Sequence, residues 1–176
     1  MKRRHAVAAF FYLLNSPMQR FVPPLLDRLI DSAPLSRSEP LRPALSMAQL
    51  KDSVARDVES LLNARRGSTR EALDGYPFAR ASVAAFGLDD FVSMSMSSTV
   101  DRAAICRSIE RAINDHEPRL RNARVELDRR DAATQKLRFS IHATLHAHPL
   151  QEPVNFDAVL QTTTQSYAVQ SSRRSA

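Results

Sequence analysis

Apolar residues repeat at helical spacing near the middle of the chain. Ser46 is followed three residues later by Gln49, which is typical of a capping box at the start of a helix. Gly67 is the residue expected to end this helix. Between them, apolar positions recur at spacings of four, four, three and one: Leu50, Val54, Val58, Leu61 and Leu62.

Two further helices are expected from similar patterns. One begins near Thr99 and ends by about Glu117, because Pro118 cannot continue it. The other is a short amphipathic helix that follows Pro23 and Pro24, since proline suits the first turn of a helix.

The last third of the chain changes to a period of two, which is typical of β-strands. Apolar and polar residues alternate at residues 123–127 and 154–160, and Tyr167 and Val169 indicate a final edge strand. Helices followed by strands predict an α+β fold, with N-terminal helices packed on a small antiparallel C-terminal sheet. The clearest strand places these residues on one face: Leu137, Phe139, Ile141, Ala143 and Leu145.

The net charge of +6 suggests a polyanionic partner until its position is considered. Four units come from residues 1–20 and two from Arg173 and Arg174, whereas residues 21–170 carry 19 basic and 19 acidic side chains. Only three of the 25 basic residues are lysines. Arginine forks suit pairing with carboxylates at protein interfaces, although codon usage in a GC-rich genome explains the bias equally well.

One domain is expected over residues 21–170, between a basic extension at 1–20 and a basic tail at 171–176. The apolar run at residues 6–14 follows three basic residues, as in a secretory signal, but no cleavage site follows it and it is too short to cross a bilayer. We therefore expect either a poorly ordered extension or a true start at Met18.

No cofactor, metal or catalytic site is predicted. Cys106 is the single cysteine, and the three glycines are too far apart for a phosphate-binding loop. His142 and His146 would lie roughly 13 Å apart along a strand, too far to share a metal ion, although His146 and His148 could share one. With no cysteine nearby, a solvated strand face is the default interpretation of these histidines. The serine-rich residues 93–98 lack the Gly-x-Ser-x-Gly motif of hydrolases.

Two other kinds of site remain weakly supported. Glu117 with Asp57 or Glu59 could form the acid pair of a glycosidase, but such pairs occur in nearly every helical protein. The neutral body and 6% aromatic content provide neither a phosphate track nor stacking platforms, so no nucleic-acid partner is expected. No direct membrane insertion is expected either.

Two segments each contain acidic and basic residues within an apolar stretch of sequence. The first covers residues 56–65 on the predicted helix, and the second is Glu117-Pro118-Arg119-Leu120 at a helix exit. They are interpreted either as an ion-pair network that orients helix and strand, which would add little stability, or as a docking surface of arginine forks and carboxylates.

Five segments in this order resemble the TssE family of type VI secretion baseplate subunits, which is related to phage baseplate wedge proteins. The resemblance extends over about residues 23 to 170. The segments are Pro24–Leu29, Ser53–Arg65, Ser82–Leu88, Ile109–Leu120 and Leu137–Ala143.

The resemblance implies a cytoplasmic structural protein, without cofactors, in a baseplate docked at the inner membrane. It implies the baseplate subunits TssF, TssG and TssK as partners, and the sheath subunits TssB and TssC, whose polymerisation it would start by strand donation. The family is sometimes labelled lysozyme-like, so a peptidoglycan hydrolase is the alternative function. A polyanion-binding module that uses the two termini is the third.

The resemblance also implies which residues bind partners. Glu117, Pro118, Arg119 and Leu120 would belong to the patch that contacts the wedge. The residues expected to support that patch are Arg56, Asp57, Asn63 and Arg65. Phe156, Tyr167 and Val169 mark the strands expected to pair with a partner strand by β-augmentation.

Overall fold

The computed structural model divides the chain into two compact units, residues 1–50 and 51–176, and each is considered by itself. The single domain expected over 21–170 stays a prediction. The short helix expected after Pro24 lies almost wholly outside the described residues, as do the basic extension and most of the tail. The structure describes residues 21–24, 27, 45–67, 71–80, 82–91, 94–95, 98–128, 136–161 and 164–172.

In the first unit, Phe21 and Leu45 form an antiparallel bridge. The N–H of Phe21 donates to the carbonyl of Leu45 at 2.8 Å, and the reverse bond is 2.7 Å long. The predicted capping box is also present. The N–H of Ser46 donates to Gln49 Oε1 at 2.9 Å, and the N–H of Gln49 donates to Ser46 Oγ at 3.3 Å.

Two long helices contribute to the second unit. Helix α3 (Met47–Asn63) begins in the first unit, and helix α5 (Thr99–His116) begins after Ser98, whose hydroxyl accepts a hydrogen bond from the N–H of Asp101. Glu117 caps the end of α5 directly before Pro118, as predicted. Among the residues described between α3 and α5 there are three single-turn helices: η1 (Glu71–Leu73), α4 (Pro77–Arg80) and η2 (Val83–Ala85).

Helix α3 ends four residues before Gly67, so the predicted end was wrong. After Asn63 the chain pairs with Leu88 instead of continuing the helix: Ala64 O accepts from the N–H of Leu88 at 2.9 Å, and the N–H of Arg66 donates to Leu88 O at 3.0 Å. Gly87 permits this approach with φ of 108°. A Cβ at Gly87 would lie 2.6 Å from the Ala64 carbonyl oxygen, so only glycine fits here without movement.

Four antiparallel strands form a sheet in the order β1-β2-β3-β4. Their spans are β1 (Leu120–Asp128), β2 (Lys136–Ala147), β3 (Leu150–Gln161) and β4 (Ser166–Ser171). Strands β2 and β3 pair along their whole length, with Ile141 opposite Phe156, and β4 pairs with the second half of β3. Each of these strands had been predicted from the alternation of apolar residues.

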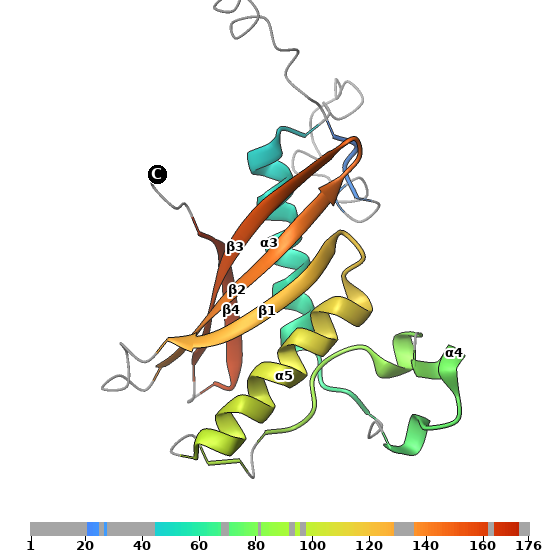
Figure 1. Ribbon diagram of the computed structural model, residues 1–176, viewed down its shortest axis with the longest axis vertical. Helices are drawn as coiled ribbons and strands as arrows, with labels where there is room; N and C mark the ends of the chain where they lie inside the picture. Colours follow the sequence, from blue (N-terminus) through green and yellow to red (C-terminus); the bar gives the residue numbers. More distant parts are fainter. Residues whose placement is uncertain are drawn as a thin grey trace, which may run out of the picture. The chain divides into compact units, whose positions relative to one another are not determined.

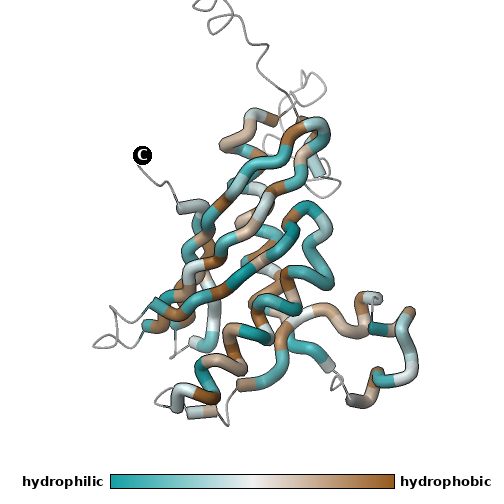
Figure 2. The backbone as a smooth tube through the Cα atoms, viewed as in Figure 1, coloured by the Kyte–Doolittle hydropathy of each residue, from teal (hydrophilic) through white to brown (hydrophobic). Residues whose placement is uncertain are grey.

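The core of this unit lies on one face of the sheet. In β2 and β3 the buried positions alternate with partly exposed ones, and Phe139, Ile141 and Phe156 are at most 1% exposed. Figure 1 shows α3 crossing behind the sheet and α5 running beside β1. Apolar positions recur along these helices and strands in Figure 2. Helices α3 and α5 supply Val54, Val58, Ile109 and Ile113 to the core, so the predicted α+β fold is confirmed.

Candidate functional site

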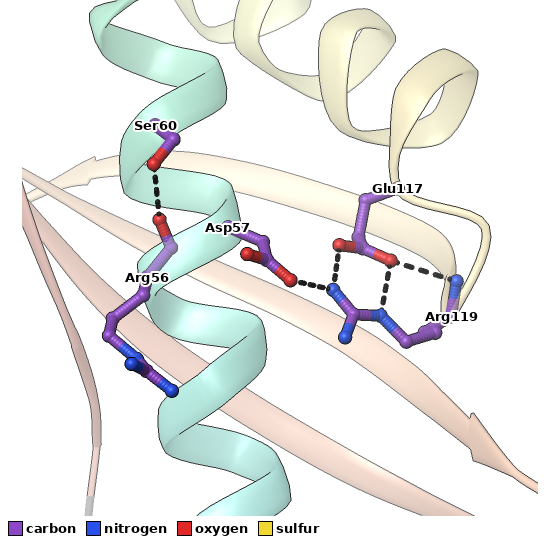
Figure 3. A network of polar contacts seen from close by, with 5 residues as sticks. All are labelled: Arg56, Asp57, Ser60, Glu117 and Arg119. Carbon is purple, nitrogen blue, oxygen red and sulfur yellow. Dashed lines mark hydrogen bonds and ion pairs between the residues drawn. The ribbon is translucent and has the colours of Figure 1, made fainter. Parts of the chain in front are cut away.

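Asp57, Glu117 and Arg119 meet where α5 leads into β1, and we call them the charged corner. Arg119 Nε donates to Glu117 Oε1 at 2.8 Å, and a terminal guanidinium nitrogen of Arg119 reaches both Glu117 Oε2 and Asp57 Oδ2 (Figure 3). The backbone N–H of Arg119 also donates to Glu117 Oε1 at 3.1 Å. The corner therefore connects α3, the end of α5 and the start of β1.

Burial makes this corner more than a surface ion pair. The Glu117 side chain is 7% exposed and that of Arg119 25%. Burial alone lowers the pKa of the Arg119 guanidinium, but the hydrogen bonds and charges of Glu117 and Asp57 outweigh it and raise the pKa above its ordinary value. Because removal of one partner leaves a buried charge unpaired, the three residues depend on one another.

The corner still has donors to offer. A guanidinium carries five N–H groups, and the second terminal nitrogen of Arg119 has no hydrogen-bond partner among the described residues. Pro118 next to it is exposed. The corner can therefore present a fixed arginine to a carboxylate or carbonyl of another protein.

Other residues predicted to join this patch lie elsewhere. The side chain of Arg56 points away from the corner (Figure 3), and its carbonyl accepts from Ser60 Oγ at 3.0 Å. Arg65 donates to the carbonyl of Gln165 at 3.1 Å. Leu120 directly follows Arg119 but is 0% exposed, so its side chain is not available to a partner while the domain keeps this fold. Phe156, which was predicted to mark a strand for pairing with a partner and not to join this patch, is also 0% exposed.

Asn63 holds the edge of β4 instead of the charged corner. Its side-chain amide donates to the carbonyl of Tyr167 at 2.9 Å and accepts from the N–H of Tyr167 at 2.8 Å. One turn earlier, Glu59 accepts from the N–H of Val169 at 2.8 Å. We call Glu59 and Asn63 the β4 clamp. Asn63 had been predicted to support the charged corner, and Glu59 had been considered as part of the charged segment 56–65 and as an acid-pair partner.

Burial also affects the Tyr167 side chain itself. Its hydroxyl is buried without a hydrogen-bond partner in the part of the chain that the structure describes. Burial raises the pKa of Tyr167 to about 12, with a smaller opposing contribution from Arg65.

A small polar hollow lies on another side of α5. Its walls include Arg66, Asp89, Ser108 and His116, and its volume of about 20 Å³ is enough for one water molecule. Arg66 and Ser108 both bind the carboxylate of Asp89, while Arg66 Nε has no partner among the described residues.

The other candidates for chemistry are not brought together. His142 Nδ1 lies 2.7 Å from Asn155 Oδ1, and no group of three possible metal ligands occurs among the described residues. Both oxygens of Glu117 bind Arg119, which also binds Asp57. Glu117 and Asp57 thus share one guanidinium, whereas Glu59, the other acid considered for a glycosidase pair, binds the N–H of Val169. Within the described ranges no helix has the length and hydrophobicity needed to span a membrane.

Comparison with known proteins gives one family. The family described as Baseplate wedge protein gp25 matches residues 48–150, which is more than half of the chain. The match includes α3, α5, the charged corner and the first two strands. No curated protein matches the chain.

Proposed function

The chain belongs to the Baseplate wedge protein gp25 family, and from this we propose that it is the TssE-type subunit of a type VI secretion baseplate. In this role it joins the baseplate wedge through the charged corner and starts polymerisation of the contractile sheath. Its proposed wedge partners are TssF, TssG and TssK, and its proposed sheath partners are TssB and TssC. The proposed location is the cytoplasmic face of the inner membrane.

One observation carries the docking part of this proposal. Arg119 is fixed from two sides by Glu117 and Asp57 and keeps one terminal nitrogen without a partner among the described residues. A side chain that is already ordered loses little conformational entropy when a partner binds it. The corner also lies inside the residues that match the family.

Sheath initiation needs a strand edge that another subunit can use. β4 is the last strand of the sheet, with only β3 beside it among the described strands. An edge strand is the usual place for β-augmentation. The side chains of Tyr167 and Val169 are buried, so they would contribute through their backbone groups.

Arg119→Glu tests the docking surface. The substitution places a third carboxylate beside Glu117 and Asp57, so we expect TssF and TssG to be lost when the tagged chain is purified from cells that express the whole system. Arg121→Glu makes the same charge change at an exposed position two residues away, and it should leave co-purification intact.

Circular dichroism of both variants establishes whether they are folded. If folded Arg119→Glu still recovers TssF and TssG in normal amounts, the charged corner is not the docking surface. If the unaltered chain recovers neither protein, the proposed baseplate role itself is wrong.

A further inference from the structure

The outer edge of β1 is closed by the same two residue types as the outer edge of β4. The side-chain oxygen of Asn114 in α5 accepts a hydrogen bond from the N–H of Ala123 at 3.1 Å. The side-chain nitrogen of Asn114 donates to the carbonyl of Ala123 at 3.4 Å. Glu110, one turn earlier, accepts from the N–H of Val125 at 3.0 Å. We call Glu110 and Asn114 the β1 clamp.

In both clamps a helix replaces the missing neighbour strand. The asparagine amide binds both the N–H and the C=O of one edge residue, as a residue of a paired strand would. The glutamate then takes the N–H two residues further along, which is the next group that points out of the sheet. A partner strand added at either edge would need these same backbone groups.

The two closures depend on different parts of the chain. Asn114 and Ala123 are nine residues apart, and α5 leads directly into β1 through the charged corner. The backbones of α5 and β1 also run close together, as Figure 1 shows. Asn63 and Tyr167 are 104 residues apart, and Glu59 and Val169 are 110 apart. No short connection holds α3 against β4.

We propose that the β4 clamp is a releasable closure, which gives way when β4 pairs with an extended strand of another subunit. The β1 clamp is a fixed closure of the opposite edge. This proposal rests on the proposed function, because it assumes that β4 receives a strand. It adds that the N–H and C=O of Tyr167 and the N–H of Val169 are already bonded in the free protein, so strand addition requires exchange of the Glu59 and Asn63 bonds for those of the incoming strand.

The exchange is balanced in its hydrogen bonds. The N–H and C=O of Tyr167 and the N–H of Val169 are bonded before and after strand addition. Glu59 is partly exposed and Asn63 is exposed, so both side chains can return to water when they are displaced. An incoming strand thus leaves no buried polar group of the clamp without a partner.

Asn63→Ala and Asn114→Ala form a matched pair for the test, because each removes one amide from one edge. In the full chain, we expect Asn63→Ala to speed hydrogen exchange at the amides of Tyr167 and Val169 at least tenfold. Asn114→Ala should change the exchange of Ala123 and Val125 less than threefold, because α5 remains next to β1. Equal effects at the two edges would contradict the difference between the clamps.

Strand capture is measured with a labelled synthetic peptide that has the sequence of residues 164–172. We expect about tenfold tighter binding to Asn63→Ala than to the unaltered chain, and no change with Asn114→Ala. A peptide N-methylated at alternate residues should not bind, because it lacks the N–H groups for pairing. Unchanged or weaker binding to Asn63→Ala would overturn the proposal.

Asn63→Asp serves if the alanine variant does not fold. It keeps an acceptor for the N–H of Tyr167 but loses the donor for the carbonyl, so exchange and peptide binding should change in the same directions by a smaller factor. These measurements use the chain without any baseplate protein. They can therefore fail while docking through Arg119 stands, and the reverse is also possible.

Discussion

The two edges of the sheet carry the same pair of side chains, yet one is joined to its helix by the chain and the other is not. At β1 the helix, the turn and the strand are consecutive, and Glu117 fixes the turn by binding Arg119. At β4 the helix and the strand come from opposite ends of the second unit. Hydrogen bonds of similar length can thus close an edge whose helix is also joined to it by a short stretch of chain and an edge whose helix is not.

Glu117→Ala should have the largest effect and should act mainly on the β1 side. It leaves the Arg119 guanidinium three-quarters buried with only Asp57 as a partner, so we expect a loss of about 3 kcal/mol in the free energy of unfolding in urea. Glu126→Ala, at an exposed position of β1, should cost less than about 0.5 kcal/mol. If the Glu117 variant increases the rate of amide exchange more at Tyr167 than at Ala123, relative to the unaltered chain, the assignment of this corner to β1 is contradicted.

Gly87→Ala should act on the β4 side, because Gly87 packs against Ala64 directly after Asn63. The positive φ and the contact with the Ala64 carbonyl should together cost about 2 kcal/mol, measured by urea unfolding. Gly75→Ala is the control, since Gly75 also has positive φ but open space around its Cα. Its cost should be smaller, and an equal cost would mean that the approach to Ala64 does not matter.

Tyr167→Phe should have the smallest effect on stability at neutral pH, and at alkaline pH it should act on the β4 edge. Removal of a buried hydroxyl without a described partner should stabilise the chain by up to about 1 kcal/mol. Burial raises the pKa of Tyr167 from 10.0 to about 12, so the unfolded chain loses this proton first. This contribution to stability is complete below pH 10 and is lost as the pH rises towards 12.

The Tyr167→Phe variant should lack that part of the alkaline loss. Unfolding measured between about pH 8 and 11, in a Cys106→Ala background that removes the thiol titration, isolates the tyrosine. If the pH profiles are identical with and without the Tyr167→Phe substitution in this background, the hydroxyl does not influence the β4 edge.

Features that depend on residues close together in the sequence could be predicted from the sequence alone. The strand with Phe139 and Ile141, and the end of α5 before Pro118, follow from local periodicity and from proline geometry. The end of α3 could not be predicted, because it is determined by the pairing of Ala64 and Arg66 with Leu88. Gly67 is the residue type that commonly follows the end of a helix, but it lies four residues after Asn63, the last residue of α3.

The candidate site shows the same division. Glu117 and Arg119 are two residues apart, so their pairing was within reach of the sequence, whereas the approach of Asp57 depends on the fold. Asn63 was chosen as a partner-binding candidate but was given the wrong neighbours. A repeated signal was available: Glu59 and Asn63 are four residues apart on one helix, and so are Glu110 and Asn114 on the other. Only the structure shows that both pairs face a strand edge.

Cys106 continues the row formed by Glu110 and Asn114, one turn earlier on α5, where it is partly buried and bonded to the backbone of Leu127. Burial and the nearby charge of Glu110 raise the pKa of this thiol. Because the thiolate is the reactive form, the one cysteine of the chain is kept protonated and slow to oxidise at neutral pH.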